Sequence, residues 1–226
     1  MASTPNQLRR LRGAAVAALL ALLGPVLAAC GTPEYRFVSN RELGSFVRIP
    51  STWAVQDLTE NQSQGRVNPL PSGIQSVWKL AFVSGDPDSV DEQGLPAEVT
   101  GRIEVYQVSD YYREQYSISA LRSTQTIGMS VDPVYPPDGV GSERVELGAY
   151  EQLSVGGVAG SRSVANLNTA TEDADPTWVT QNLTLLFDHD SGRIYVLSMY
   201  CSGTCYLENR QAIDEVAASF AVRNDV

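Results

Sequence analysis

The alternation of hydrophobic and polar residues predicts four consecutive strands in the second half of the chain, at 143–154, 158–167, 178–187 and 193–200. Between them stand the turn sequences Gly156-Gly157, 173–176 and Asp190-Ser191-Gly192, and turns of this composition join neighbouring antiparallel strands. A meander of antiparallel strands is the simplest arrangement that this order allows.

The last two of these stretches differ in how their faces are composed. In 193–200 both faces of the strand are apolar, with Ile194 on one face and Tyr195 on the other. We therefore expect this strand in the middle of a sheet that is covered on both sides. In 178–187 the residues Thr180, Asn182 and Thr184 share one face. That face is expected to be wet or only lightly covered.

Earlier in the chain the pattern predicts shorter strands, separated by polar loops rich in proline and glycine. These strands are expected at 45–49, 53–55, 77–83 and 99–105. The acidic residues of 85–98 form the loop between the last two, and 128–142, with three prolines, forms a loop farther on.

Two segments follow a helical period instead. In 110–127, Tyr112, Tyr116 and Ala120 recur every fourth residue. Near the end of the chain, 213–220 carries an apolar stripe that predicts a closing amphipathic helix. Strands, a helix, four strands and a helix define the α+β class, with an antiparallel sheet and helices packed on its faces.

The first thirty residues have the organisation of an export signal. Three arginines precede the apolar run 14–23, which has about half of the ~20 residues that a spanning helix needs. Leu27-Ala28-Ala29-Cys30 follows and resembles the lipobox of bacterial lipoproteins, which implies a diacylglycerol on the Cys30 thiol. The alternative is an ordinary signal cut near Ala29 with Cys30 there by chance.

The lipobox resemblance implies a signal peptide at 1–29 and a lipidated N-terminus at Cys30. The low periodicity of the residues that follow predicts a tether, so that 30–44 form the lipidated N-terminus and tether, and the strand and helix pattern predicts one globular domain at 45–226. Two or more acyl chains hold a protein stably on a bilayer, so the expected location is the outer face of the cytoplasmic membrane, with the lipid bilayer as partner through Cys30. The general secretory route is favoured, although Arg9-Arg10 leaves twin-arginine export open.

The charge of the chain excludes some partners. The formal net charge is −10, and removing 1–29 leaves 13 basic and 26 acidic residues, a charge of −13. A field of this sign repels nucleic acid, and it predicts that the tethered domain stands off an anionic bilayer.

The remaining cysteines, Cys201 and Cys205, are separated by only three residues. An exported chain meets an oxidising compartment, so we expect a disulfide between them. A redox pair is the alternative, although the spacing is not the usual C-x-x-C. With a single histidine in the chain, the usual zinc ligand sets cannot form, and no metal or other cofactor is expected.

Few residues suggest catalysis. His189 stands between Asp188 and Asp190, so a base oriented by a carboxylate is conceivable, but the sequence is that of a hairpin turn. An acidic loop contains Asp86, Asp88, Asp91 and Glu92, and calcium is the best metal candidate for it. The spacing of these residues does not match a calcium-binding motif. Tyrosines around the middle helix suit either a ligand-facing surface or the rim of a packed helix: Tyr106, Tyr111, Tyr112 and Tyr116.

Two stretches carry a resemblance to a known fold. The early strand and turn 46–53 and the closing helix 213–220, taken with the order of elements, resemble the PsbP-like α/β/α sandwich. Actinobacterial lipoproteins are similar in plan, and fifteen arginines against one lysine fit such a source. The resemblance implies a binding or assembly role and supplies no catalytic motif. We therefore expect a non-catalytic domain that binds an envelope protein or small ligand, with an envelope hydrolase using an acidic pair or His189 as the alternative.

Overall fold

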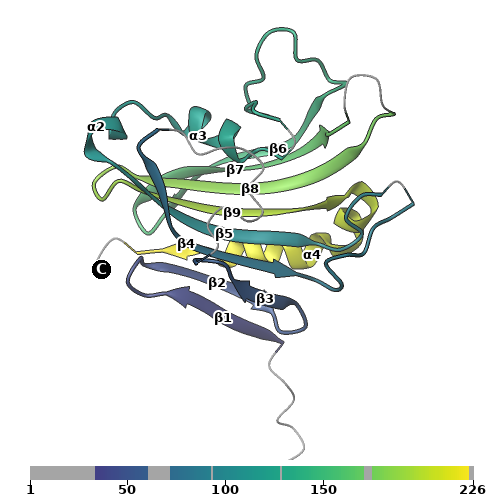
Figure 1. Cartoon of the computed structure of the whole chain (residues 1–226), viewed down its shortest axis with the longest axis horizontal. Helices are drawn as coiled ribbons and strands as arrows, with labels where there is room; N and C mark the ends of the chain where they lie inside the picture. The colour runs from purple at the N-terminus through teal and green to yellow at the C-terminus, as the bar shows by residue number, and fades with distance from the viewer. Residues whose placement is uncertain (1–33, 61–71, 93, 128, 171–174, 224–226) are drawn as a thin grey trace, which may run out of the picture. The chain divides into compact units, whose positions relative to one another are not determined.

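The structure is a computed structural model that describes residues 34–60, 72–92, 94–127, 129–170 and 175–223 (Figure 1). A three-stranded sheet has the spatial order β1 (Tyr35–Asn40), β2 (Ser45–Pro50) and β10 (Ala221–Val222). A seven-stranded antiparallel sheet has the order β3 (Ala54–Asp57), β4 (Ile74–Val83), β5 (Thr100–Val108), β9 (Arg193–Ser202), β8 (Trp178–Asp188), β7 (Val158–Asn168) and β6 (Val145–Val155). The helices are α2 (Asp110–Arg113), α3 (Ile118–Gln125) and α4 (Gly203–Ser219).

The large sheet lies between two covering layers. Helix α3 packs on β8 from one side, over an apolar cluster that contains Leu121, Leu185 and Val196. Helix α4 packs on β8 and β9 from the other side, and the three-stranded sheet lies beside α4 in the same layer (Figure 1). The Tyr195 hydroxyl of β9 donates a hydrogen bond to the Leu43 carbonyl, 3.0 Å away, and so joins the two sheets. The predicted α+β class, with helices on both faces of an antiparallel sheet, is confirmed.

The predicted meander is also confirmed, because β6, β7, β8 and β9 follow one another as antiparallel neighbours. The turn between β6 and β7 consists of Gly156 and Gly157, with φ of 57° and 85°. Two consecutive positive φ angles define the tight turn that glycine favours in a hairpin. Strand β9 is fourth of seven, as its two apolar faces predict.

The expectation of a wet face on β8 is wrong. Thr180, Asn182 and Thr184 are all buried. The reason is that this face lies under α4, where polar side chains find partners inside the protein. The Asn182 amide donates to the Tyr206 hydroxyl at 3.2 Å and accepts from the Arg162 Nε at 3.1 Å.

The domain begins earlier than the expected boundary at residue 45. Strand β1 lies within the segment expected to be a tether, and it pairs along its length with β2, from Tyr35 opposite Pro50 to Asn40 opposite Ser45. Its alternate residues Phe37 and Ser39 are exposed. A strand at the edge of a small sheet has little apolar alternation, which is why the sequence pattern did not reveal it. Residues 1–29 and Cys30 lie outside the described residues.

The single helix expected at 110–127 is two short helices. Helix α2 ends at Arg113, and the Ser117 hydroxyl then accepts the backbone N–H of Ala120 at 3.1 Å, which caps the start of α3. Tyr112 and Tyr116 still lie together, with ring centroids 6.3 Å apart, because both pack at the edge of the cluster beneath α3. The predicted grouping of these side chains on one side is therefore correct, whereas the predicted continuous helix is wrong.

The predicted disulfide joins Cys201, near the end of β9, to Cys205, in the first turn of α4, with 5.9 Å between the Cα atoms. Ser202 between them caps the helix by accepting the Cys205 N–H at 3.4 Å. Both cysteines are buried in the cluster beneath α4. The bridge thus fixes the corner at which the central strand turns into the helix that covers it.

A buried ion pair holds the proline-rich loop 129–142 against α3. Arg122 donates from Nε and Nη2 to the carboxylate of Asp132, at 2.5 and 2.6 Å, and from Nη1 to the Ser161 hydroxyl of β7 at 2.7 Å. Burial alone would raise the pKa of Asp132, but the hydrogen bonds from Arg122, Ser119 and the Val134 N–H hold this pKa below its ordinary value. The pair connects a helix, a loop and a strand.

We expect reduction of the disulfide to lower the melting temperature by several degrees without unfolding the domain, because a loop this small restrains the unfolded chain by only about 2 kcal/mol. Thermal unfolding with and without reductant measures the shift, and alkylation with mass spectrometry counts free thiols in the native protein. Two thiols that alkylate freely without reductant would show that the native protein lacks the bond.

We expect Asp132→Asn to destabilise the domain by about 3–5 kcal/mol at pH 7, because it leaves the buried Arg122 charge without its counter-charge. A carboxylate with a lowered pKa stabilises the fold above its unfolded pKa and loses that effect as pH falls through the folded value. The difference between variant and wild type should therefore shrink below about pH 4. Urea unfolding at pH 7 and at acidic pH measures it.

Asp138→Asn is the matched control, because Asp138 belongs to the same loop and is exposed. It should leave stability unchanged within about 0.5 kcal/mol. Equal stability of the two variants at pH 7 would contradict the anchoring role of the ion pair.

Candidate functional site

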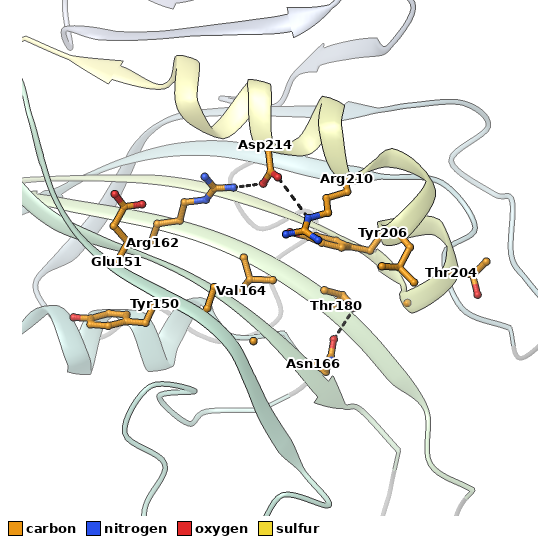
Figure 2. Close-up of a pocket in the computed structure, with 14 residues that line it drawn as sticks. Tyr150, Glu151, Arg162, Val164, Asn166, Thr180, Thr204, Tyr206, Arg210 and Asp214 are labelled. Atoms are coloured by element: carbon orange, nitrogen blue, oxygen red, sulfur yellow. Dashed lines mark hydrogen bonds and ion pairs between the residues drawn. The ribbon is translucent and has the colours of Figure 1, made fainter.

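A cleft of about 950 Å³ lies between α4 and the outer strands β6, β7 and β8 (Figure 2). Its floor is formed by one face of the strands, with Ala149 and Glu151 from β6 and Arg162 and Val164 from β7. Its wall is the first three turns of α4, including Tyr206, Leu207, Arg210 and Asp214.

The cleft exists because α4 is narrower than the sheet. Strands lie about 4.8 Å apart and a packed helix is about 10 Å wide, so one helix covers roughly two strands. Helix α4 covers β8 and β9, and the sheet continues through β7 to β6 beyond it. The surface of these two outer strands beside α4 is therefore left open.

The charges in the cleft are matched. Arg162 donates to the Asp214 carboxylate at 2.5 Å, and Arg210 lies 3.7 Å from the other oxygen of the same carboxylate. Glu151 stands directly opposite Arg162 on the neighbouring strand. Two arginines and two acidic residues leave the lining of the cleft itself with no net charge.

Uncharged groups complete the lining. The Thr180 hydroxyl donates to the Asn166 side chain at 2.8 Å. Burial raises the pKa of Tyr206, so its phenol stays protonated and held against Asn182. At the rim Leu207 is 72% exposed, near the apolar floor residue Val164. A concave, partly apolar lining with fixed polar groups is typical of a binding site.

Strand β6 forms the open side of the site and is one edge of the large sheet. Residues 146–152 are all exposed. Because the Gly156-Gly157 turn makes Val155 and Val158 a hydrogen-bonded pair, the pairing alternates along the strand. The N–H and C=O groups of Tyr150, Gln152 and Ser154 accordingly point away from β7, toward the free edge.

The residues predicted from the sequence lie elsewhere, apart from the disulfide. Cys201 and Cys205 bracket the start of α4, and Gly203 and Thr204 between them line the cleft. The disulfide therefore positions one end of the wall. Cys30 lies outside the described residues.

His189 occupies the turn between β8 and β9 that its sequence predicts. It is exposed, and its ring packs on Phe187 with centroids 4.0 Å apart. The Asp188 carboxylate accepts the Asp190 N–H at 3.0 Å and the Ser191 hydroxyl at 2.5 Å, so it stabilises the turn. At about 3.3 Å per residue, nine residues of β8 place His189 about 30 Å from Thr180 in the cleft. Nothing in this arrangement favours the hydrolase alternative.

The acidic loop uses its carboxylates for its own backbone. Asp86 accepts the Asp88 N–H at 3.0 Å and Asp91 accepts the Leu95 N–H at 2.9 Å. Over the described part of the chain, no three histidine, cysteine or acidic side chains gather as metal ligands. Of the tyrosines, Tyr106 is buried and donates to Glu104 at 2.6 Å, whereas Tyr111 is 78% exposed.

Sequence reasoning missed the cleft itself. Its lining comes from four elements that only the sheet brings together, and no local motif marks them. One residue could have pointed to an exposed apolar surface on α4. Leu207 is apolar but lies outside the apolar stripe predicted at 213–220.

Comparison with known proteins adds similarity in fold only. No family model matches the chain, and no curated protein matches its sequence. PsbP of the cyanobacterium Synechocystis has 11% identity and a TM-score of 0.43, over 86% of this chain and 95% of that one. The Ran-binding protein Mog1p of Saccharomyces cerevisiae has 12% identity and a TM-score of 0.43, over 83% and 95%.

LpqN, involved in cell envelope biogenesis of Mycobacterium tuberculosis, has 11% identity and a TM-score of 0.40, over 84% of this chain and 90% of its own. The PsbP-like plan expected from the sequence thus meets a similarity in fold, and the α+β class is shared with these structures. At these identities and TM-scores the similarity is one of fold alone. Within the described residues, no helix has the length and apolar character needed to cross a membrane.

Proposed function

We propose that this protein is a lipid-anchored binding domain without catalytic activity, held on the outer face of the cytoplasmic membrane. Its cleft between α4 and β6–β8 holds an extended segment of a partner protein. The observation that carries the proposal is the continuity of the cleft with the free edge of β6.

The anchor rests on the lipobox-like sequence that ends at Cys30. Cys30 precedes Tyr35, the first residue of β1, by five residues. Five residues span at most about 18 Å, so a lipid on Cys30 would hold the domain close to the membrane surface. A lipid anchor of two or more chains would suffice for stable attachment without any spanning helix.

An extended segment fits the open side of the cleft because a free strand edge offers main-chain hydrogen bonds. A peptide paired with Tyr150 and Gln152 would place alternate side chains on the two faces of the sheet. Those on one face would enter the cleft toward Val164 and Leu207. Those on the other would meet Tyr150 and Tyr135, whose rings lie 6.5 Å apart.

The charge of the edge indicates the composition of the segment. Glu146 and Glu151 are exposed on β6, and the whole domain is acidic. Complementary potential favours a partner segment with basic residues among its apolar ones. It disfavours pairing of β6 with β6 of a second copy, because two domains of charge −13 would repel each other.

We expect Cys30→Ala to abolish fatty-acid attachment and stable membrane association, because Cys30 is the proposed attachment site of the lipid. Growth with an alkyne-tagged fatty acid, followed by fractionation, measures both. The double variant Cys201→Ala with Cys205→Ala should remain labelled. A Cys30→Ala protein that keeps its label, or that stays in the membrane at mature size, would contradict the anchor.

We expect peptides selected on the domain from a phage-displayed library to bind Gln152→Pro about tenfold more weakly than wild type, since proline removes an edge N–H donor. Gln152→Ala is the matched control and should bind as wild type does. Proline is tolerated where the N–H faces solvent, so both variants should keep their melting temperature. Fluorescence anisotropy with the selected peptides measures the affinities.

The selected peptides should alternate apolar and basic residues. Equal affinity of Gln152→Pro and Gln152→Ala would rule out strand addition at β6. Failure of selection to enrich any sequence on the wild-type domain would count against the binding function itself.

A further inference from the structure

The outer face of the three-stranded sheet combines aromatic rings with arginines. We call this surface the β1–β2 face, and it consists of Tyr35, Phe37, Phe46, Arg48 and Arg223. It lies away from the cleft, and Figure 1 shows β1 and β6 at opposite ends of the stack of strands.

The strand register places these residues on one side of the small sheet. Phe37 is paired with Arg48, and Phe46 with Ala221 of β10. Their neighbours Val47 and Val222 point the other way, into the cluster beneath α4. The small sheet therefore packs one face on this cluster, with the β2 residues buried and Val38 of β1 partly buried, and presents the other face outward.

Phe37 is 83% exposed, more than any other large apolar side chain in the described part of the chain. Around it, the Arg48 guanidinium lies over the Tyr35 ring, 4.5 Å from its centroid, and Arg223 lies over Phe46 at 5.1 Å. Aromatic rings beside arginines are typical of surfaces at a membrane–water interface, where rings sit among headgroups and guanidinium groups meet phosphates.

The charge of the chain is divided unevenly around this surface. Residues 34–50 and 221–223, taken with Glu215 of α4, contain four arginines and three glutamates, a charge of +1. Glu215 belongs to this surface because its carboxylate accepts the Tyr35 hydroxyl and interacts with Arg48. The rest of the chain after residue 29 therefore carries −14. A domain with this asymmetry, brought near an anionic bilayer, turns its positive end toward the lipid and its acidic remainder away from it.

We propose that the β1–β2 face rests on the headgroups of the membrane that holds Cys30, with Phe37 inserted among them. The inference rests on the proposed lipid anchor, because the short connection from Cys30 to Tyr35 is what keeps this face near the bilayer. It replaces the expectation that the acidic domain stands off the membrane. The cleft and the β6 edge are then turned away from the lipid and open to partners.

The test uses the lipidated protein in vesicles of phosphatidylcholine and phosphatidylglycerol that contain a lipid with a nitroxide-labelled headgroup. An environment-sensitive dye is attached to Phe37→Cys or, as the control, to Tyr111→Cys, an exposed position in α2. We expect the dye at position 37 to lose most of its fluorescence by quenching and the dye at 111 to keep it. Vesicles of phosphatidylcholine alone, or high salt, should reduce the quenching at 37.

A second set of variants separates the face from the anchor. Arg48→Gln with Arg223→Gln, added to Phe37→Cys, should reduce the quenching while the protein still floats with the vesicles. Equal quenching at 37 and 111 in a protein that floats would overturn the docking face and leave the anchor intact. An N-terminal peptide without lipid in the mass spectrum would overturn the anchor, and this proposal with it.

Discussion

Both faces of the seven-stranded sheet must be kept from water, and the rest of the domain follows from that constraint. Strand β9 lies at the centre, with Val196 packed toward α3 and Leu197 toward α4. Burial of apolar surface at about 25 cal/mol per Å² makes such a strand stable only when both sides are covered. The cover comes from segments far apart in sequence: helix 118–125 on one side, and helix 203–219 with the three-stranded sheet on the other.

The covering elements are fixed by a small number of specific contacts. The disulfide and the Ser202 cap set where α4 leaves β9, and Tyr195 joins β9 to the small sheet through Leu43. On the opposite side the Arg122–Asp132 pair binds a proline-rich loop that has little apolar surface of its own. A buried pair of this kind gives little net stability but strongly disfavours arrangements in which one charge is left alone.

The functional surfaces lie where the covering ends. Helix α4 leaves β6 and β7 partly open, and this gap, with the edge of β6 that no described strand pairs, forms the proposed binding site. The small sheet buries one face and exposes the other, which forms the proposed contact with the membrane. Together the two proposals define an orientation of the domain relative to the membrane, with the β1–β2 face on the lipid and the β6 cleft facing the partner.

The sequence alone determined the strands of the meander, the Cys201–Cys205 disulfide and the hairpin turn at 188–191. Alternation predicted β6 to β9 because side chains on a strand alternate between faces, and Cys201 and Cys205 are too close in sequence to need a fold to bring them together. Asp188, Asp190 and Ser191 likewise predicted the hairpin that holds His189, since turn residues act over a few bonds.

Only the tertiary structure decided which polar residues are buried and which elements meet. The sequence pattern placed Asn182 on a wet face, whereas in the structure α4 covers it and supplies its partner Tyr206. Strand β1 has no pattern of its own in the sequence and is defined by its pairing with β2. The cleft unites Glu151, Arg162, Thr180 and Asp214, which are spread over more than sixty residues of sequence. Such a site depends on the order of the strands in the sheet and on how many strands one helix covers. Both are set by contacts between distant segments, so no local sequence pattern predicts them.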